Sequence, residues 1–160
     1  MIYIENKPAG MTSKDFADII KDKNKLKKIC FCGRLDPMAR AQMLLLGDAT
    51  CKKMDNYLNT EKTYQFEICL GFMTDSDDPM GIIQKQDNNF NEKDILEKII
   101  EYIKNMDTNI NQEFHKFSSI RIDGKPSWLH TKEKTKFKKP KHDVSIKNKK
   151  IIGKTCRELK

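Results

Sequence analysis

The stretch Gly33-Arg34-Leu35-Asp36-Pro37-Met38-Ala39 lies between two apolar segments, and the rest of the N-terminal fold can be worked out from it. Glycine permits backbone conformations that are closed to other residues. Proline fixes its own φ and ends any regular element. We therefore predict an irregular loop from Gly33 to Ala41 that displays Asp36 on a defined backbone.

Spacing alone leaves Asp36 with two interpretations. A carboxylate on a rigid loop is a usable nucleophile, and Arg34, two residues away, could keep it ionised. An aspartate before a proline also often starts an Asx turn or caps a helix. On spacing alone the turn or cap is the favoured interpretation.

Regular elements are expected on both sides of this loop. Thr12 and Ser13 can cap a helix with Phe16, Ile19 and Ile20 on one face. The other elements expected in this half are strands at Ile2–Ile4, Lys28–Phe31 and Met43–Leu46 and a helix at Ala49–Leu58. Thr63–Leu70 alternates and predicts a strand with Tyr64, Phe66 and Ile68 on one face.

The second half begins with an acidic turn at Asp75–Gly81 and a strand at Ile82–Gln86. Asn91 caps the clearest helix, whose aliphatic stripe we expect to pack in the core: Ile95, Leu96, Ile99, Ile100 and Ile103. Later expectations are a strand at Ser118–Ile122, a turn at Asp123-Gly124 and a strand pair within Val144–Ile152.

Helices and strands mix without a strict βαβ repeat, which favours an α+β fold with a mixed, mainly antiparallel sheet flanked by helices. The chain has 160 residues and shows no internal repeat or linker, so we expect a single domain, 1–160.

Composition narrows the protein class. No apolar run approaches the roughly 20 residues of a membrane helix, and the N-terminus does not resemble a signal peptide. We expect a soluble, intracellular protein, most simply a cytoplasmic one. The five cysteines are irregularly spaced, which argues against a disulfide framework. Cys30-Phe-Cys32 lacks a second Cys/His pair at zinc-site spacing, so we expect reduced, mostly buried thiols and no metal.

The positive charge is concentrated at one end of the sequence. Residues 131–160 hold 12 Lys/Arg and 3 Asp/Glu, whereas the other 130 residues hold 19 and 20. Such a block attracts polyanions, of which nucleic acid is the commonest. A solvated, lysine-rich tail explains the charge equally well.

Six segments, in order, resemble the TruB-type pseudouridine synthases. The loop matches the family's central pattern G-x-L-D-P-x-A. The other matching segments are Lys7–Ser13, Leu46–Thr50 with Tyr57-Leu58, Lys62–Tyr64 with Leu70-Gly71, Thr74–Asp78 with Gly81, and Phe117–Arg121 with Asp123–Lys125. Together they span roughly residues 7–126.

The resemblance implies a reaction. These enzymes detach uracil from its ribose, rotate it and rejoin it through carbon 5, usually at uridine 55 in the T loop of tRNA, without a cofactor or metal. Asp36 is then the catalytic aspartate, which either attacks the anomeric carbon or removes a ribose proton. Tyr64 is the tyrosine that packs against the flipped base, and Arg34 is a further candidate catalytic residue.

The implied partner is the T-arm of tRNA. Base extrusion must be offset by contacts elsewhere, and a basic loop at about residues 112–142 suits phosphate contact and stacking. We expect residues 131–142 within it to be mobile. The candidate RNA-binding residues are Lys7, Lys28, Arg121, Lys125, Lys132, Lys134, Lys136, Lys138 and Lys139.

The sequence departs from the family at three places. Phe31 and Cys32 replace the usual His and small or hydroxyl residue, and Arg40-Ala41-Gln42 replaces a segment with Gly. The G-T-Y-x-R segment, whose arginine pairs with the catalytic aspartate, has no match; Gly153–Arg157 is a poor substitute. We therefore expect a C-terminally truncated catalytic fold without a PUA domain. Arg34 would partly compensate, and a protein partner would complete the fold. The alternative function is a catalytically inactive TruB-like RNA-binding protein or RNA chaperone.

Overall fold

The computed structural model describes residues 1–87, 89 and 91–153. The chain divides into two compact units, Met1–Phe66 and Glu67–Lys160, and each is described by itself. The α+β fold class is confirmed, because each unit combines helices with small antiparallel sheets. The single-domain assignment stays a prediction.

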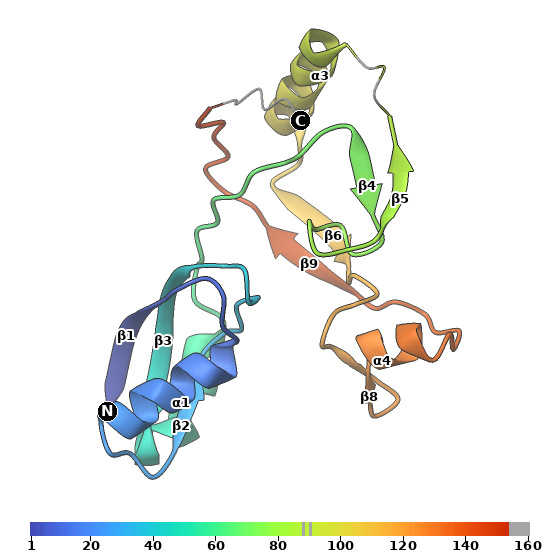
Figure 1. The fold of residues 1–160 in the computed structure, drawn as a ribbon. Coiled ribbons are helices and arrows are strands. Elements are labelled where there is room, and N and C mark those ends of the chain that lie inside the picture. The colour runs from blue at the N-terminus through green and yellow to red at the C-terminus, as the bar shows by residue number, and fades with distance from the viewer. Residues whose placement is uncertain (88, 90, 154–160) are drawn as a thin grey trace. The chain divides into compact units, whose positions relative to one another are not determined.

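The first unit is built on a three-stranded antiparallel sheet in the order β1-β3-β2 (Figure 1). Its strands are β1 (Ile2–Lys7), β2 (Ile29–Phe31) and β3 (Ala41–Gly47). The central strand β3 pairs with both neighbours, placing Leu44 opposite Ile4 and Leu46 opposite Cys30. The predicted strands at Ile2–Ile4, Lys28–Phe31 and Met43–Leu46 are present, and the loop between β2 and β3 carries Asp36.

Helix α1 (Ser13–Lys23) supplies the other half of the core. Thr12 caps it as predicted, because its hydroxyl accepts a hydrogen bond from the Asp15 amide. The buried cluster comprises Phe16, Ala17, Ile20, Met43 and Leu45. Ile19, which we placed on the buried face, is 52% exposed, and Ala17 faces the core in its place. The predicted helix at Ala49–Leu58 is divided into η1 (Asp48–Lys53), a 3-10 helix, and α2 (Asp55–Leu58).

The second unit consists of strand pairs and two helices. β4 (Phe72–Thr74) pairs with β5 (Ile83–Gln86), β6 (Asn109–Glu113) with β9 (Lys141–Ser145), and β7 (Arg121–Ile122) with β8 (Lys125–Pro126). Helix α3 (Glu92–Asn105) is capped by Asn91 as predicted, and α4 (Ser127–Lys132) is a short helix that we did not predict.

Two predictions about the C-terminal third need correction. The irregular basic loop predicted at residues 131–142 is shorter and covers residues 133–140, because α4 ends at Lys132 and β9 begins at Lys141. The expected strand pair within Val144–Ile152 is absent, since β9 pairs with β6 from further back in the chain. β9 pairs with β6 at five positions, from Asn109 opposite Ser145 to Glu113 opposite Lys141, and not with a strand after Asn148.

The predicted strand at Thr63–Leu70 is also absent. These residues have no regular secondary structure, and every one of them is exposed. Among the strand pairings of the described residues, none includes this stretch. Alternating side chains form a strand only where a neighbouring strand satisfies the backbone and a core covers one face.

The stripe on α3 does not form a core. The helix has no buried residue, and its aliphatic positions are at most half-buried. The helical period was read correctly, but no described element packs closely enough on that face to exclude water. The prediction of core packing is therefore wrong for the structure of this chain.

Candidate active site

Asp36 lies at the edge of an open pocket in the first unit. The pocket has a volume of about 570 Å³ and lies between α1, β2 and the loop. Ala17, Ile29 and Phe31 form an apolar part of its wall, and Thr12, Lys14, Asp18 and Arg34 contribute polar groups. Asp36 itself is exposed, so its carboxylate is accessible from solvent.

The backbone behind Asp36 is held by a buried lysine. Lys7 is 1% exposed, at the end of β1. Its ammonium donates to the carbonyl oxygens of Pro8 at 2.9 Å, Ala39 at 2.8 Å, and Asp36 and Pro37 at 3.3 and 3.4 Å. One buried cation thus ties the end of β1 to three carbonyl groups of the loop, those of Asp36, Pro37 and Ala39.

Two further residues of the Lys7–Ser13 segment hold the same loop. The Gly10 amide donates to the Pro37 carbonyl at 2.8 Å. The Ser13 hydroxyl, 3% exposed, donates to the Leu35 carbonyl and accepts from the Leu35 amide, each at 2.8 Å. The carboxylate is therefore displayed by a backbone fixed on both sides of Asp36, which is what a positioned nucleophile requires.

The prediction that Lys7 contacts RNA phosphate is wrong. A side chain that is 1% exposed and bonded to backbone carbonyls cannot reach a phosphate on the surface. The alternation along β1 could have indicated that Lys7 is buried. Lys7 lies on the same face of the strand as Tyr3 and Glu5, which are partly buried, whereas the residues that alternate with them are exposed.

The structure does not bring all three predicted catalytic residues together. Arg34 and Asp36 line the same pocket, but among the ion pairs of the described residues none joins them. Tyr64 is 73% exposed and is not among the residues that line the pocket. Its predicted place beside the reacting base stays a prediction.

The backbone conformation at the start of the loop explains why residue 33 is a glycine. Gly33 has a φ of +116°, a region that L-residues with side chains rarely adopt. A Cβ added there would meet only the end of the Lys62 side chain, at 3.9 Å. The requirement is therefore in the backbone and not in the space around it.

The thiols of Cys32 and Cys51 lie beside that of Cys30. Burial and a hydrogen bond with Cys51 raise the pKa of Cys30 to about 11, and burial raises the pKa of Cys32. The thiols of Cys30 and Cys32 are therefore protonated at neutral pH and poorly nucleophilic. Cys69 is exposed, and Cys156 lies outside the described residues.

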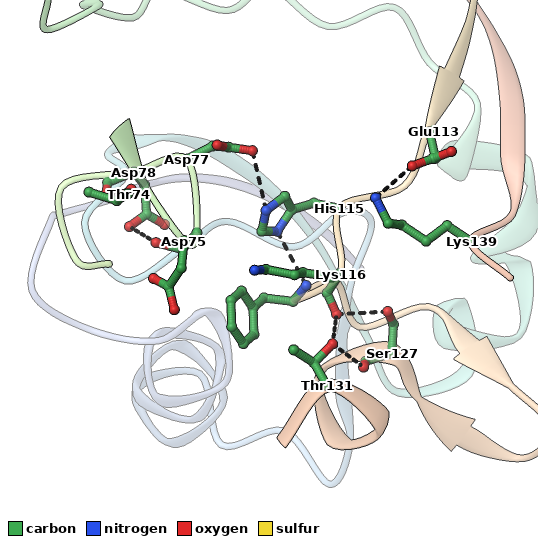
Figure 2. Close-up of polar contacts among 12 residues, drawn as sticks. Thr74, Asp75, Asp77, Asp78, Glu113, His115, Lys116, Ser127, Thr131 and Lys139 are labelled. Atoms are coloured by element: carbon green, nitrogen blue, oxygen red, sulfur yellow. Dashed lines mark hydrogen bonds and ion pairs between the residues drawn. The ribbon is translucent and has the colours of Figure 1, made fainter. Parts of the chain in front are cut away.

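The acidic turn in the second unit is joined to the start of the basic segment (Figure 2). Asp77 lies 3.3 Å from Nε2 of His115, and Nδ1 of that ring accepts the Phe117 amide at 3.2 Å. Asp75 and Asp78 accept backbone amides within the turn, from Ile82 and Met80. Gly81 is required here because a Cβ would lie 2.1 Å from the Ser76 hydroxyl.

Helix α4 is fixed to the same segment by hydroxyl groups. Ser127 and Thr131 both donate to the Lys116 carbonyl, at 2.8 and 2.9 Å (Figure 2). The ring of His130 adds contacts with Thr135 and the Ile122 carbonyl, each at 2.9 Å. Within the segment that we expected to be a basic loop, residues 121–132 therefore form a strand pair and a helix, and residues 133–140 have no regular helix or strand.

The predicted RNA-binding cations fall into two groups. Three of them make intramolecular contacts: Arg121 with the Gly124 carbonyl, Lys125 with Glu133 at 3.2 Å and Lys139 with Glu113 at 2.6 Å. The others, apart from Lys7, are exposed: Lys28, Lys132, Lys134, Lys136 and Lys138. Binding to RNA stays a prediction for all of these residues.

A family model described as TruB family pseudouridylate synthase (N terminal domain) matches residues 21–160. The chain belongs to the TruB family.

Three of its relatives show how much of a TruB-family protein is present. A tRNA pseudouridine synthase B of Mycoplasma mycoides is 32% identical over 94% of this chain and 49% of its own length. One of Mesoplasma florum is 33% identical over 91% of this chain and 50% of its own length. One of Bacillus subtilis is 30% identical over 92% and 47%, respectively. The chain spans about half the length of the curated relatives it matches.

The hydrogen bonds around Asp36 join two segments that both resemble TruB-family motifs. The two TruB-like segments 7–13 and 33–39, which are separate in sequence, are joined here by hydrogen bonds from Lys7, Gly10 and Ser13. Phe31 stands in the pocket wall at a place where the resemblance led us to expect histidine. The poor match at Gly153–Arg157 lies outside the described residues except for Gly153.

No helix in residues 1–87, 89 and 91–153 is long and apolar enough to cross a membrane. In the same residues no group of three or more His, Cys, Asp or Glu side chains could hold a metal ion.

Proposed function

We propose that this chain carries the nucleophile-bearing part of a tRNA pseudouridine synthase that converts uridine 55 in the T loop of tRNA to pseudouridine. The observation that carries the proposal is the exposed Asp36 on a loop clamped by Lys7 and Ser13, at the edge of an open pocket. The names of the TruB-family relatives give the reaction and the substrate class.

The chemistry requires one carboxylate and no cofactor or metal. In one form of the reaction, an Asp36 oxygen bonds to the anomeric carbon while the bond to uracil N1 breaks and its electrons pass to the base. The rotated base then bonds through carbon 5, the carboxylate leaves, and carbon 5 loses its proton to solvent. In the other form Asp36 removes a ribose proton first. A fixed backbone serves both forms, because each needs one oxygen at a defined distance from the ribose.

The RNA contacts are assigned to the exposed basic side chains. A base in a folded loop must be unstacked before it reaches a pocket beside Asp36, which costs a few kcal/mol. Lys132, Lys134, Lys136 and Lys138 are exposed along the segment after α4 and are suited to phosphate contact. We propose the T-arm of tRNA as the partner of this segment, and with it a soluble, intracellular protein.

The proposed enzyme includes a second polypeptide. The chain spans about half of its TruB-family relatives, and its second unit lacks a buried apolar core among the described residues. We propose that a protein partner completes the fold and supplies the arginine that pairs with Asp36. Arg34, in the same pocket, would substitute for that arginine in part.

The experiment follows tritium release from carbon 5 of uridine in an unmodified tRNA transcript. We expect the wild-type chain to release tritium and the Asp36→Ala variant to release none. Asp18→Ala is the matched control, because Asp18 lines the same pocket but is paired with Lys14 on α1. Arg34→Ala should lower the rate if Arg34 acts in place of the arginine of the G-T-Y-x-R segment, and an unimpaired variant would remove that role.

Absence of release by chain and partner together, with tRNA binding intact, would reject the proposal in favour of an RNA-binding protein. Binding should weaken steeply between low and high salt, because each phosphate contact releases counterions.

A further inference from the structure

Met38 is an exposed apolar side chain close to Asp36 in the sequence. It is 61% exposed, and among the exposed large apolar side chains of the described first unit it is the one on the loop that carries Asp36. Of the described residues, those that line the pocket or pack against the core cluster do not include Met38. A single exposed methionine is ordinary on a protein surface. A role for Met38 therefore depends on where the loop places it.

One tight turn displays both Asp36 and Met38. Pro37 and Met38 occupy the two central positions of this turn. The Ala39 amide closes it by donating to the Asp36 carbonyl at 3.0 Å. The Lys7 ammonium binds the carbonyl groups before and after Met38, so the backbone on both sides is held. The thioether is therefore an exposed side chain on a fixed turn.

A nucleotide that reaches Asp36 must come close to Met38. Consecutive Cα atoms are about 3.8 Å apart, so those of Asp36 and Met38 are at most about 7.6 Å apart. Successive nucleotides of a stacked strand are about 3.4 Å apart. Met38 therefore lies within about two stacking steps of the nucleotide on which Asp36 acts, which is within reach of a neighbouring base.

Extrusion of the target uridine uncovers the base next to it. The proposed reaction takes the uridine out of its stack, which leaves one apolar face of the neighbouring base open to water. Methionine suits such a face, because its unbranched, polarisable side chain adapts to flat surfaces and makes favourable contacts with aromatic rings. Apolar side chains, methionine among them, are inserted between base steps by several DNA-binding proteins.

Other side chains of the first unit are less suited to this position. Phe31 is partly buried and packs against the core cluster, so its ring serves the fold. Tyr64 is 73% exposed, but it lies outside the loop and is not among the residues that line the pocket. Arg34 lines the pocket itself, beside Asp36. Met38 is thus the apolar side chain that the loop leaves open to a neighbouring base.

We propose that Met38 packs against the base next to the extruded uridine and so holds the RNA loop open while Asp36 acts. Met38 contacts the substrate but takes no part in making or breaking bonds. The inference rests on the proposed function, because it requires an RNA whose uridine reaches Asp36. It adds a contact with the base stack to the phosphate contacts assigned to the lysines after α4.

The experiment uses the full chain and a T-arm RNA hairpin that carries tritium at carbon 5 of the target uridine and 2-aminopurine directly before or after it. The fluorescence of 2-aminopurine rises when its stacking neighbour leaves. We expect the wild-type chain to raise the fluorescence. Met38→Ala should reduce that rise and lower the rate of tritium release by about tenfold or more. The Kd for the hairpin should change by less than about threefold, because the phosphate contacts are intact.

Three variants and one exchange measurement separate this contact from a structural effect. Met38→Leu keeps an apolar side chain of similar volume and should retain most of the wild-type rate. Ile19→Ala removes a side chain that is 52% exposed on α1 and does not line the pocket, and it should change neither readout. Asp36→Ala should abolish release but keep the fluorescence rise. Hydrogen exchange at the buried Leu45 amide should be the same in Met38→Ala and the wild type, because an exposed side chain adds little to stability.

An RNA that lacks the neighbouring base tests the contact directly. With an abasic site at that position Met38 has nothing to pack against, so Met38→Ala should lower the rate by no more than about twofold. An equal loss with the intact hairpin and with abasic hairpins at both neighbouring positions would overturn the proposal. A Met38→Ala chain that matches the wild type in rate and fluorescence would overturn it too, as would a Met38→Leu chain that is equally impaired.

The outcomes also separate this inference from the proposed function. A fluorescence rise that depends on Met38, without tritium release, would leave the inference standing and count against the proposed function alone. Tritium release that is unchanged in Met38→Ala would overturn the inference and leave the proposed function standing. A wild-type chain that leaves the fluorescence unchanged would overturn the inference, whether or not tritium is released.

Discussion

Replacing Lys7 with methionine should loosen the loop that carries Asp36. Methionine fills most of the volume of the lysine stem but donates no hydrogen bond. The Asp36 and Pro37 carbonyls keep backbone partners in the Ala39 and Gly10 amides. The two carbonyls with the shortest bonds to the ammonium, Pro8 and Ala39, lose a charged donor.

The magnitude follows from these two losses. An acceptor left unsatisfied in a buried site costs about 1–3 kcal/mol, so two acceptors cost about 2–6 kcal/mol. Burying an ammonium is itself unfavourable, and methionine relieves that cost. A net destabilisation of about 2 kcal/mol is expected, which is a substantial part of the roughly 5–15 kcal/mol that stabilises a domain.

The measurement is hydrogen exchange at the buried Leu45 amide in β3, which reports opening of the first unit. Lys28→Met is the control for loss of charge, since Lys28 is exposed and should change stability by less than about 0.5 kcal/mol. If the free energy of opening of the first unit were the same in Lys7→Met and Lys28→Met, the Lys7 ammonium would not be holding the loop, and the reasoning would be refuted.

Three other predictions concern single groups. Ser13→Ala removes both hydrogen bonds to the loop backbone and should destabilise the first unit by about 1–3 kcal/mol, measured by the same exchange. At pH 8, iodoacetamide should alkylate Cys69 far faster than Cys30, whose pKa of about 11 leaves about one thiolate in a thousand; equal rates by mass spectrometry would contradict this. Lys139 lowers the pKa of Glu113, so their contribution to stability is present above the usual glutamate pKa and is lost as pH falls through the lowered one; an NMR titration should show this pKa rise toward its ordinary value in Lys139→Met, with Lys141 still lowering it slightly.

Local signals were sufficient for the first unit. The strands, the Thr12 cap and the irregular loop depend on neighbours in sequence, or on apolar runs whose partners lie in the same 66 residues. The loop was predicted to be rigid for the right local reason at Gly33. Its attachment through Lys7 was missed, because a lysine in an alternating segment is normally assigned to solvent, and only the fold shows four carbonyls around it.

The second unit was harder because its elements depend on distant partners. The stripe on α3 and the alternation at Thr63–Leu70 were recognised correctly as periods, but a period does not say what covers the apolar face. β9 was misassigned because its partner β6 lies about thirty residues earlier, a pairing that no local rule provides. Helix α4 is too short for a periodic signal and is fixed by hydroxyl contacts with one carbonyl.

The open stretch at Thr63–Leu70 also has a consequence for the chain when it is produced alone. A short, alternating, Pro-free segment with high β-propensity is the type of sequence that stacks into cross-β assemblies. Its only charge is Glu67, with Glu61 and Lys62 just before it, and such flanking charges are the usual protection against stacking. Removing them should make the chain more prone to form fibrils, so we expect its resistance to aggregation to depend on a few charges beside the segment.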